Sequence, residues 1–325
     1  MQENFSYEEY AVFNEIKREN RNGIRKLGFV AGMCVLLYIC LSFVLGELLT
    51  VTGLRELASK SDVVNHALGI IISFLCVFVP FFIISLSKRH NILETLTFEK
   101  PNSYKSSAAL IVGGFGLLMV SNLFATLIAG ILSLLGHNPN MGVAQVPIGT
   151  TVFGFIMYSF KIAVIPALTE EFAIRGVLMQ PLRKYGDWFA IITSSAVFAL
   201  MHGEFIQGIF AFLAGVILGY VVVSTGTIWT GVILHFINNM FSVIISGIGL
   251  KNIYVANTVY WVAVILSAIV AWIVLTKFFS SDNAYNLKKV ETGLTAGQKF
   301  FSYIFNFPII VSMIFITISI VKSIG

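Results

Sequence analysis

The run LGFVAGMCVLLYICLSFVLGELL, Leu27–Leu49, is about 23 residues long and carries a single charged side chain, Glu47. At a rise of about 1.5 Å per residue, a helix of this length crosses the roughly 30 Å hydrocarbon core of a bilayer. The whole chain has the same character, since 57% of its 325 residues are hydrophobic and only 11% are charged. This composition excludes a soluble globular domain and predicts an all-α, polytopic transmembrane helix bundle.

Apolar runs of comparable length recur along the chain and predict about nine membrane-spanning helices, with eight as the lower count. We expect them at 27–49, 67–87, 107–135, 157–181, 188–204, 206–224, 228–249, 256–279 and 300–322. Residues 27–325 are therefore predicted to form one transmembrane domain. Residues 1–26 form a predicted cytoplasmic N-terminal segment, either an amphipathic helix lying on the membrane or a solvated tail.

Basic residues cluster in alternate loops, which predicts the orientation of the chain. They precede the first predicted span and follow the second, fourth and eighth: Lys17, Arg18, Arg21, Arg25, Lys26, Lys88, Arg89, Lys100, Lys105, Arg183, Lys184, Lys277, Lys288, Lys289 and Lys299. Because cytoplasmic loops carry an excess of Lys and Arg, the N-terminus is predicted to be cytoplasmic. The net charge of +5 is explained in this way, and no nucleic-acid partner is expected.

The stretch TEEFAIRGVL, Thr169–Leu178, places three ionisable side chains inside a predicted span. A charged side chain at the bilayer centre costs at least about 2.5–3.5 kcal/mol, so such residues usually face the interior of the bundle. Glu171 and Arg175 are four residues apart and can pair on one helix face. Glu170 is turned by about 100° from Glu171, so its carboxylate remains available.

Two further predicted spans carry polar groups. His202 ends the run FALMH, and HFINN places His235 and Asn239 on one helix face. Counting residues from the predicted cytoplasmic ends brings Glu170, His202 and His235 to similar depths, within about two helical turns. This predicts an active site in a cavity between the fourth, fifth and seventh helices, reached from the cytoplasmic side.

The residue types in this predicted cavity are compatible with two kinds of hydrolysis. A glutamate shielded from bulk water can act as a general base, and a neighbouring histidine can hold the shared water. A second imidazole and an amide can then donate hydrogen bonds to an oxyanion. Alternatively, one carboxylate and two imidazoles form a ligand set for catalytic zinc with an open position for water. Residue types alone leave both schemes open.

Three motifs in this region resemble those of the CPBP family of intramembrane endopeptidases. EExxxR is present as Glu170 to Arg175, FxxxH as Phe198 to His202, and HxxxN/D as His235 to Asn239. The family includes the type II CAAX prenyl proteases and the ABI group of bacterial proteins linked to bacteriocin processing and self-immunity. The motif-bearing region is predicted at about 157–249, and the resemblance covers roughly a quarter of the chain.

The resemblance implies a role for each motif residue. Glu170 and His202 would activate water, His235 and Asn239 would stabilise the oxyanion, and Glu171 and Arg175 would support the site. We expect no cofactor, because the amide of Asn239 is better suited to donating hydrogen bonds than to binding zinc. If zinc is used, Glu170, His202 and His235 would be its ligands, as the family's older description as metalloproteases implies.

The predicted function is hydrolysis of a peptide bond in a membrane-associated peptide or protein substrate, and short loops suit a bacterial plasma membrane. Nothing in the flanking sequence indicates a prenylated substrate. One alternative is a noncatalytic immunity or sensor protein that binds a peptide or partner through the same cavity. A proton-coupled transporter could also use intramembrane Glu and His, but the sequence lacks paired broken helices in two matching halves.

Overall fold

The computed structural model describes residues 7–86, 92–139, 151–281 and 284–324, and within these ranges it contains helices and no strand. Eight of the helices are long and apolar enough to cross a membrane. The prediction of an all-α, polytopic transmembrane bundle is therefore confirmed.

Each predicted apolar run corresponds to a helix. In chain order these are α1 (Tyr7–Val51), α3 to α4 (Asp62–Ser85), α6 (Tyr104–Leu134), α7 to α9 (Val152–Leu182), α10 (Asp187–Met201), α11 (Phe205–Thr225), α12 (Ile228–Lys251), α13 (Ile253–Phe279) and α15 (Phe307–Ile324). The predicted span at 188–204 is the one that falls short, because α10 has only 15 residues. The count is thus eight long apolar helices and one shorter apolar helix within the described residues.

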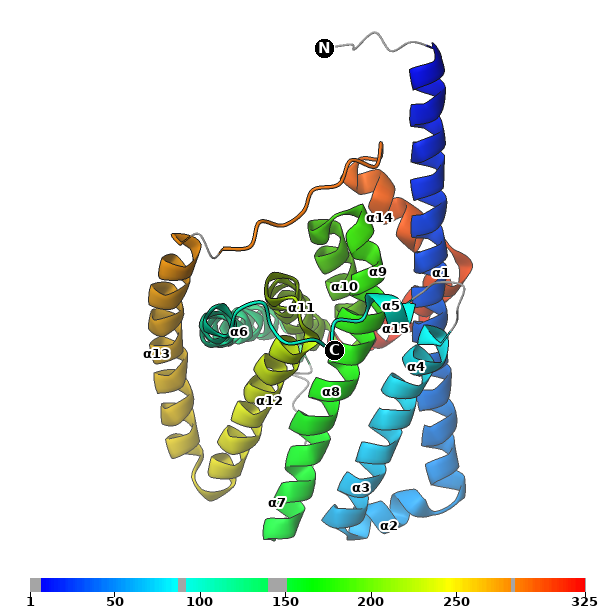
Figure 1. Ribbon diagram of the computed structural model, residues 1–325. Coiled ribbons are helices and arrows are strands. Elements are labelled where there is room, and N and C mark those ends of the chain that lie inside the picture. The colour runs from blue at the N-terminus through cyan, green and yellow to red at the C-terminus, as the bar shows by residue number, and fades with distance from the viewer. Residues whose placement is uncertain (1–6, 87–91, 140–150, 282–283, 325) are drawn as a thin grey trace.

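The predicted N-terminal segment is not separate from the first span. Residues 7–26 form the first turns of α1, which is 45 residues long and projects beyond the rest of the bundle (Figure 1). The sequence contains no proline before Pro80, so nothing forces the helix to break at the predicted boundary. Tyr10, Phe13 and Ile16 are exposed on this projecting part.

The predicted span at 300–322 is also corrected, since it is divided between α14 (Ala296–Ile304) and α15. Pro308 in the first turn of α15 has no N–H, so it cannot donate to the carbonyl of Ile304, four residues earlier, as a continuous helix would require. Asn306 caps both ends of the break. Its Nδ2 donates to the carbonyl of Tyr303 at 2.6 Å, and its Oδ1 accepts from the N–H of Ile309 at 3.2 Å.

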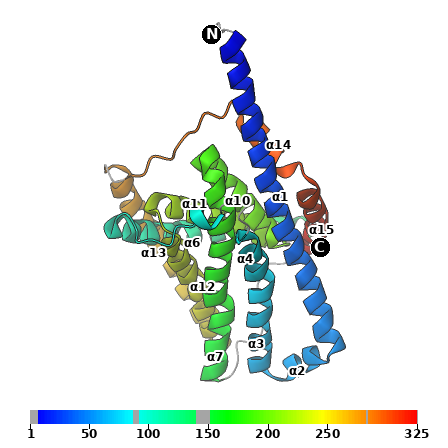
Figure 2. The same cartoon turned by 45° about the vertical axis from the view of Figure 1, so that its right-hand side comes forward.

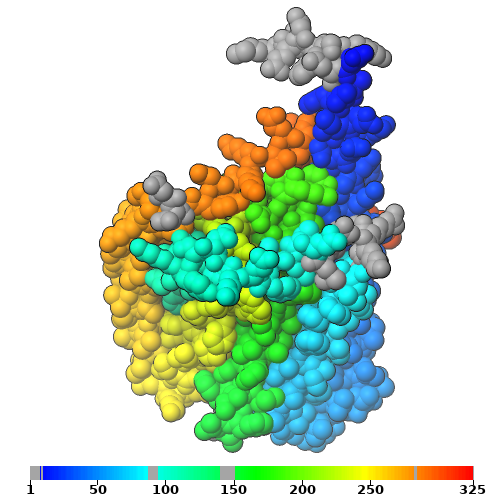
Figure 3. Space-filling view, viewed as in Figure 1, coloured from blue at the N-terminus to red at the C-terminus, as the bar shows by residue number. Residues whose placement is uncertain are grey.

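The helices run in two main directions. In Figure 1, α3, α7, α8, α12 and α13 run along the height of the molecule, whereas α6 and α11 are seen nearly end-on; Figure 2 shows the same crossing from the side. In Figure 3 the chain from α5 (Ile92–Thr95) into α6 passes across the front of the bundle. Residues of α6, α8, α11, α12 and α13 line the cavity described below.

The two ends of the bundle differ in the segments that they carry. The start of α1 and α14 lie at one end, and α2 (Leu54–Lys60) and the turn between α12 and α13 lie at the other (Figure 1). The first end carries the N-terminal basic cluster and Lys299. Which end faces the cytoplasm stays a prediction from the basic residues.

The turn before α10 is fixed by Asp187, whose side chain is almost completely buried. Its carboxylate accepts from Nε of Arg183 at 2.8 Å, from the N–H of Lys288 at 2.9 Å and from the hydroxyl of Tyr285 at 3.3 Å. Burial, and then the negative charge of Asp187, raise the pKa of Tyr285, so its hydroxyl stays protonated and donates. This carboxylate thus joins the segment after α13 to the start of α10.

We expect Asp187→Ala to lower the free energy of unfolding by about 3 kcal/mol, because it leaves a guanidinium and a backbone N–H without their acceptor. The measurement is thermal and denaturant unfolding of the purified protein in detergent. Glu56→Ala is the matched control, since it breaks an ion pair with Lys60 in which both side chains are more than two-thirds exposed, and exposed pairs contribute about 0–1 kcal/mol. Equal effects of the two substitutions would contradict the anchoring role of Asp187.

Candidate active site

The helix that carries the two glutamates is irregular on both sides of them. Between α7 (Val152–Ser159) and α9 (Gln180–Leu182), two π-helical stretches, Phe160–Val164 and Phe172–Met179, flank α8 (Ile165–Glu171). Such π-helical turns are uncommon and occur frequently at functional sites. They change the rotation of the side chains along the helix, so adjacent residues can serve different surroundings.

A cavity of about 510 Å³ lies beside this helix. Four of the predicted site residues line it together: Glu170, His202, His235 and Asn239. They come from the fourth, fifth and seventh predicted spans, as expected. The two predicted supporting residues, Glu171 and Arg175, are buried and do not belong to its lining. The structure therefore separates adjacent glutamates, with Glu170 facing the cavity and Glu171 facing the protein.

Glu171 joins two helices through one oxygen atom. Its Oε1 accepts from Nη1 of Arg175 at 2.8 Å and from Nδ1 of His235 at 2.9 Å, and the Glu171 side chain is 0% exposed. The predicted pair of Glu171 with Arg175 is present and extends to α12. His235 thereby becomes a bridge, since its Nε2 lies 3.8 Å from Oε2 of Glu170.

Gly231 on α12 makes this contact possible. A Cβ at this position would lie 2.9 Å from Oε2 of Glu171 and 2.6 Å from the side chain of Val222. A larger residue would push α12 away from the glutamate helix, and His235 would move with it. Oε2 of Glu171 is buried and has no hydrogen-bond partner among the described residues, so the Arg175 charge is its main compensation.

The ring of Phe198 occupies the centre of this arrangement. The guanidinium carbon of Arg175 lies 4.6 Å from the ring centroid. The His202 and His235 rings meet the same ring edge-on, with centroid separations of 4.7 and 6.3 Å. The first residue of FxxxH thus separates the two imidazoles and also covers the buried cation.

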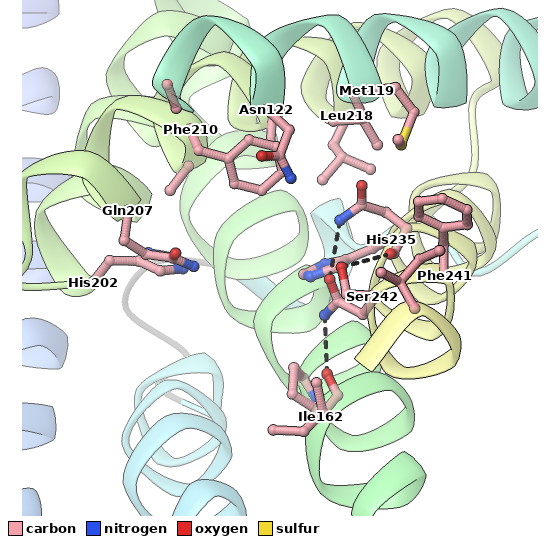
Figure 4. Close-up of a pocket in the computed structure, with 18 of the residues that line it drawn as sticks. Met119, Asn122, Ile162, His202, Gln207, Phe210, Leu218, His235, Phe241 and Ser242 are labelled. Atoms are coloured by element: carbon pink, nitrogen blue, oxygen red, sulfur yellow. Dashed lines mark hydrogen bonds between the residues drawn. The ribbon is translucent and has the colours of Figure 1, made fainter. Parts of the chain in front are cut away.

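His202 follows α10 and has one ring nitrogen fixed. Its Nδ1 lies 2.8 Å from the carbonyl of Phe198. A carbonyl only accepts, so Nδ1 carries the proton and Nε2 of the neutral ring is an acceptor. Figure 4 shows His202 beside Gln207, on the other side of the cavity from His235. No direct hydrogen bond joins His202 to Glu170 in the described part of the chain.

Asn239 compensates for a proline in the glutamate helix. Pro166 has no N–H, so the carbonyl of Ile162, four residues earlier, lacks its α-helical donor. Nδ2 of Asn239 donates to this carbonyl at 3.1 Å (Figure 4). The partner of this carbonyl therefore belongs to the HxxxN motif. Asn239 keeps a second amide N–H for another acceptor.

Three further helices contribute lining residues to the cavity. The ionisable residues of the sequence did not predict their contribution. Their lining residues include Asn122 from α6, Gln207 from α11 and Tyr260 from α13. Asn122 and Gln207 could have indicated this contribution, because each is a neutral but polar amide side chain inside a predicted apolar span.

The three side chains of the predicted zinc set do not gather as ligands. Among the residues that the structure describes, no group of three or more His, Cys, Asp or Glu side chains is arranged to hold a metal ion. His202 lies across the cavity from His235, and its Nδ1 is held by the carbonyl of Phe198 at 2.8 Å. The donor geometry therefore does not fit zinc held by Glu170, His202 and His235.

Eight long apolar helices, and a cavity within the bundle lined by a carboxylate, two imidazoles and an amide, define an integral, multi-pass membrane protein with a candidate hydrolytic site. Residues 156–241 match the family model described as Type II CAAX prenyl endopeptidase Rce1-like. The match confirms the resemblance to the CPBP family of CAAX proteases over this segment, and supports an intramembrane CAAX-type protease at the level of the family. No curated protein and no solved structure matches the chain.

We expect Arg175→Met to lower the free energy of unfolding by about 3–5 kcal/mol, because the Glu171 carboxylate would stay buried without its cation. The measurement is unfolding in detergent. Lys161→Met is the control, since it also removes a cation from this helix. Among the described hydrogen bonds, the Lys161 ammonium group donates only to the neutral side chain of Asn65, at 3.2 Å. A loss no larger for Arg175→Met than for Lys161→Met would contradict the compensation of Glu171.

We also expect Asn239→Ala to lower the free energy of unfolding by about 1 kcal/mol, because the Ile162 carbonyl would lose its donor. In a Pro166→Ala background, residue 166 regains an N–H that can take over this carbonyl. The cost of Asn239→Ala should then largely disappear, which a double-mutant cycle measures. Additive effects of the two substitutions would show that Asn239 and Pro166 are not coupled.

Proposed function

We propose that the protein is an intramembrane endopeptidase that hydrolyses a peptide bond in a membrane-associated peptide or protein substrate. One observation carries the proposal: Glu170 has its carboxylate in a cavity of about 510 Å³ with His202 and His235, while the adjacent Glu171 is neutralised behind it by Arg175. A purely structural pair of glutamates would not leave one carboxylate, 23% exposed, facing an open space.

In the proposed first step, Glu170 takes a proton from a water molecule and the resulting hydroxide attacks the carbonyl carbon of the substrate. Nε2 of His202 is the acceptor that holds the second hydrogen of this water, because its Nδ1 donates to Phe198. The product of this step is a tetrahedral intermediate with a negative oxygen. Glu170 then gives its proton to the leaving nitrogen as the C–N bond breaks, which restores the carboxylate.

The second half of the proposed mechanism stabilises the oxyanion. His235 donates from Nδ1 to Glu171, so it donates from Nε2 only when it carries both protons. That imidazolium would lie between the Glu170 and Glu171 carboxylates, and its Nε2–H would face the cavity. The second N–H of Asn239 supplies another donor, because the first is used by Ile162. In this scheme Glu171 is a positioning residue, because it orients the His235 ring that donates to the oxyanion.

The rest of the cavity suggests which substrates fit. Its described lining contains apolar side chains together with amides and hydroxyls such as Asn122, Gln207 and Ser242, and no Lys or Arg. Amides can hydrogen-bond the N–H and C=O groups of an extended peptide that would otherwise be unsatisfied within the membrane. We therefore propose an uncharged, largely apolar peptide segment as the substrate.

The proposal predicts that Glu170→Gln lowers cleavage by at least about 100-fold, because an amide cannot take a proton from water. Cleavage of membrane peptides by the full chain in liposomes is the measurement, with EDTA and 1,10-phenanthroline in parallel. Glu204→Gln is the control, since this glutamate follows His202 by two residues but does not line the cavity; it should keep most of the activity.

The alternative to the proposal is a noncatalytic immunity or sensor protein that binds a peptide in the same cavity. Complementation in cells and the liposome assay distinguish these two functions. A Glu170→Gln protein that fully restores the phenotype of a deletion strain would contradict the enzyme. Activity that is lost with chelators and regained with zinc would contradict the metal-free mechanism, while leaving proteolysis intact.

A further inference from the structure

A second cavity, of about 520 Å³, lies between α1 and α14 and shares no lining residue with the candidate active site. One wall carries Arg21 and Arg25, four residues apart on α1. The other wall is formed by α14, with Gln298 near its start and Phe301 and Phe305 towards its end. The proposed proteolysis uses none of these residues.

The polar groups of this cavity are suited to an anion. Arg21 and Arg25 are exposed, and neither forms an ion pair within the part of the chain that the structure describes; the nearby Arg18 pairs with Glu15 instead. No acidic residue belongs to the described lining. Oε1 of Gln298 accepts from the N–H of Thr295 at 3.1 Å, so its amide NH₂ remains as a further donor.

The two walls are held at a fixed spacing. A Cβ on Gly28 would overlap the backbone carbonyl of Tyr303, so α1 and α14 touch directly at one edge of the cavity. Towards the other end, Nδ2 of Asn20 donates to the carbonyl of Thr292 at 3.2 Å. The helix α14 also starts with a capping box between Thr295 and Gln298. The cavity between these contacts is therefore built into the fold.

The position of the cavity points to a lipid rather than to a soluble anion. Arg21 and Arg25 lie just before the apolar run that starts at Leu27, at the level expected for headgroups. Phe301 and Phe305 are 59% and 57% exposed, and Phe307 at the start of α15 is 75% exposed. These rings continue from the cavity to a membrane-spanning helix, where acyl chains would lie.

From this combination of paired guanidinium groups and exposed aromatic rings, we infer that the cavity between α1 and α14 binds an anionic phospholipid. The phosphate lies between Arg21 and Arg25, where both guanidinium groups donate to its oxygens. The acyl chains lie along Phe301 and Phe305. The site holds a membrane lipid that is neither the substrate nor the product of the proposed reaction.

The test titrates the purified full chain in zwitterionic detergent with dihexanoyl phosphatidylglycerol, dihexanoyl phosphatidylcholine or inorganic phosphate, followed by native mass spectrometry. Wild type is expected to bind one phosphatidylglycerol saturably and the other two far more weakly. The double variant R21Q/R25Q is expected to bind phosphatidylglycerol roughly 30-fold more weakly. This fold-change corresponds to the loss of about 1 kcal/mol of attraction to the headgroup for each of the two cations.

Two matched controls separate the site from general charge and from general packing. R55Q/K251Q also removes two basic residues, from the opposite end of the bundle, and is expected to bind as wild type. Gly297→Leu keeps both arginines and adds a side chain at a position that lines the cavity and is open, since a Cβ there has no atom within 4 Å; it is expected to weaken binding strongly. Gly130→Leu, at an equally open position of α6, is expected to leave binding unchanged.

Several outcomes would overturn the inference. If R21Q/R25Q and R55Q/K251Q weakened phosphatidylglycerol binding equally, the binding would depend only on the net charge of the protein. If Gly297→Leu left the binding unchanged, the cavity would be excluded as the binding site. Phosphatidylcholine binding as tightly as phosphatidylglycerol would exclude the role of the arginines. Inorganic phosphate that competes at the same concentration would make this a phosphate site and not a lipid site.

Discussion

The buried carboxylate of Glu171 is the constraint on which the rest of the site depends. A carboxylate that is 0% exposed is strongly destabilising unless it is paired and hydrogen-bonded. Arg175 from the same helix supplies the charge, and His235 from α12 supplies the second hydrogen bond. Because Phe198 of α10 covers the guanidinium and contacts both imidazoles, one desolvated charge fixes three helices relative to one another.

This constraint explains why two adjacent glutamates have different surroundings. Glu171 faces the protein and satisfies the cation, so Glu170, about 100° around the helix, faces the cavity. The irregular backbone on both sides is compensated locally as well. The Ile162 carbonyl that Pro166 deprives of a donor receives one from Asn239, so the HxxxN motif completes a hydrogen bond of the helix that carries EExxxR.

Much of this arrangement could be predicted from the sequence, because helical periodicity and hydropathy act locally. The spacing of Glu171 and Arg175 predicted their pair, and the apolar runs predicted the helices. The bond from Asn239 to Ile162 could not be predicted, since it depends on how α12 packs against the helix that contains Pro166. The contributions of Asn122 and Gln207 were missed because the predicted site was built from ionisable side chains, whereas these two are neutral amides. The division of 300–322 depends on capping by Asn306, which outweighs a continuous apolar pattern.

Helices outside the segment that matches the family model also position the candidate site. His202 lies at the end of α10, where a short helix would fray without support. The hydroxyl of Tyr38 on α1 reaches the carbonyl of Met201 at 3.4 Å, and Ser323 on α15 accepts from the N–H of Phe205 at 2.9 Å. These two bonds hold the turn around His202 from both sides. Since α1 also forms one wall of the inferred lipid site, the helix that would contact the lipid is also the one that steadies His202, the imidazole that holds water in the proposed mechanism.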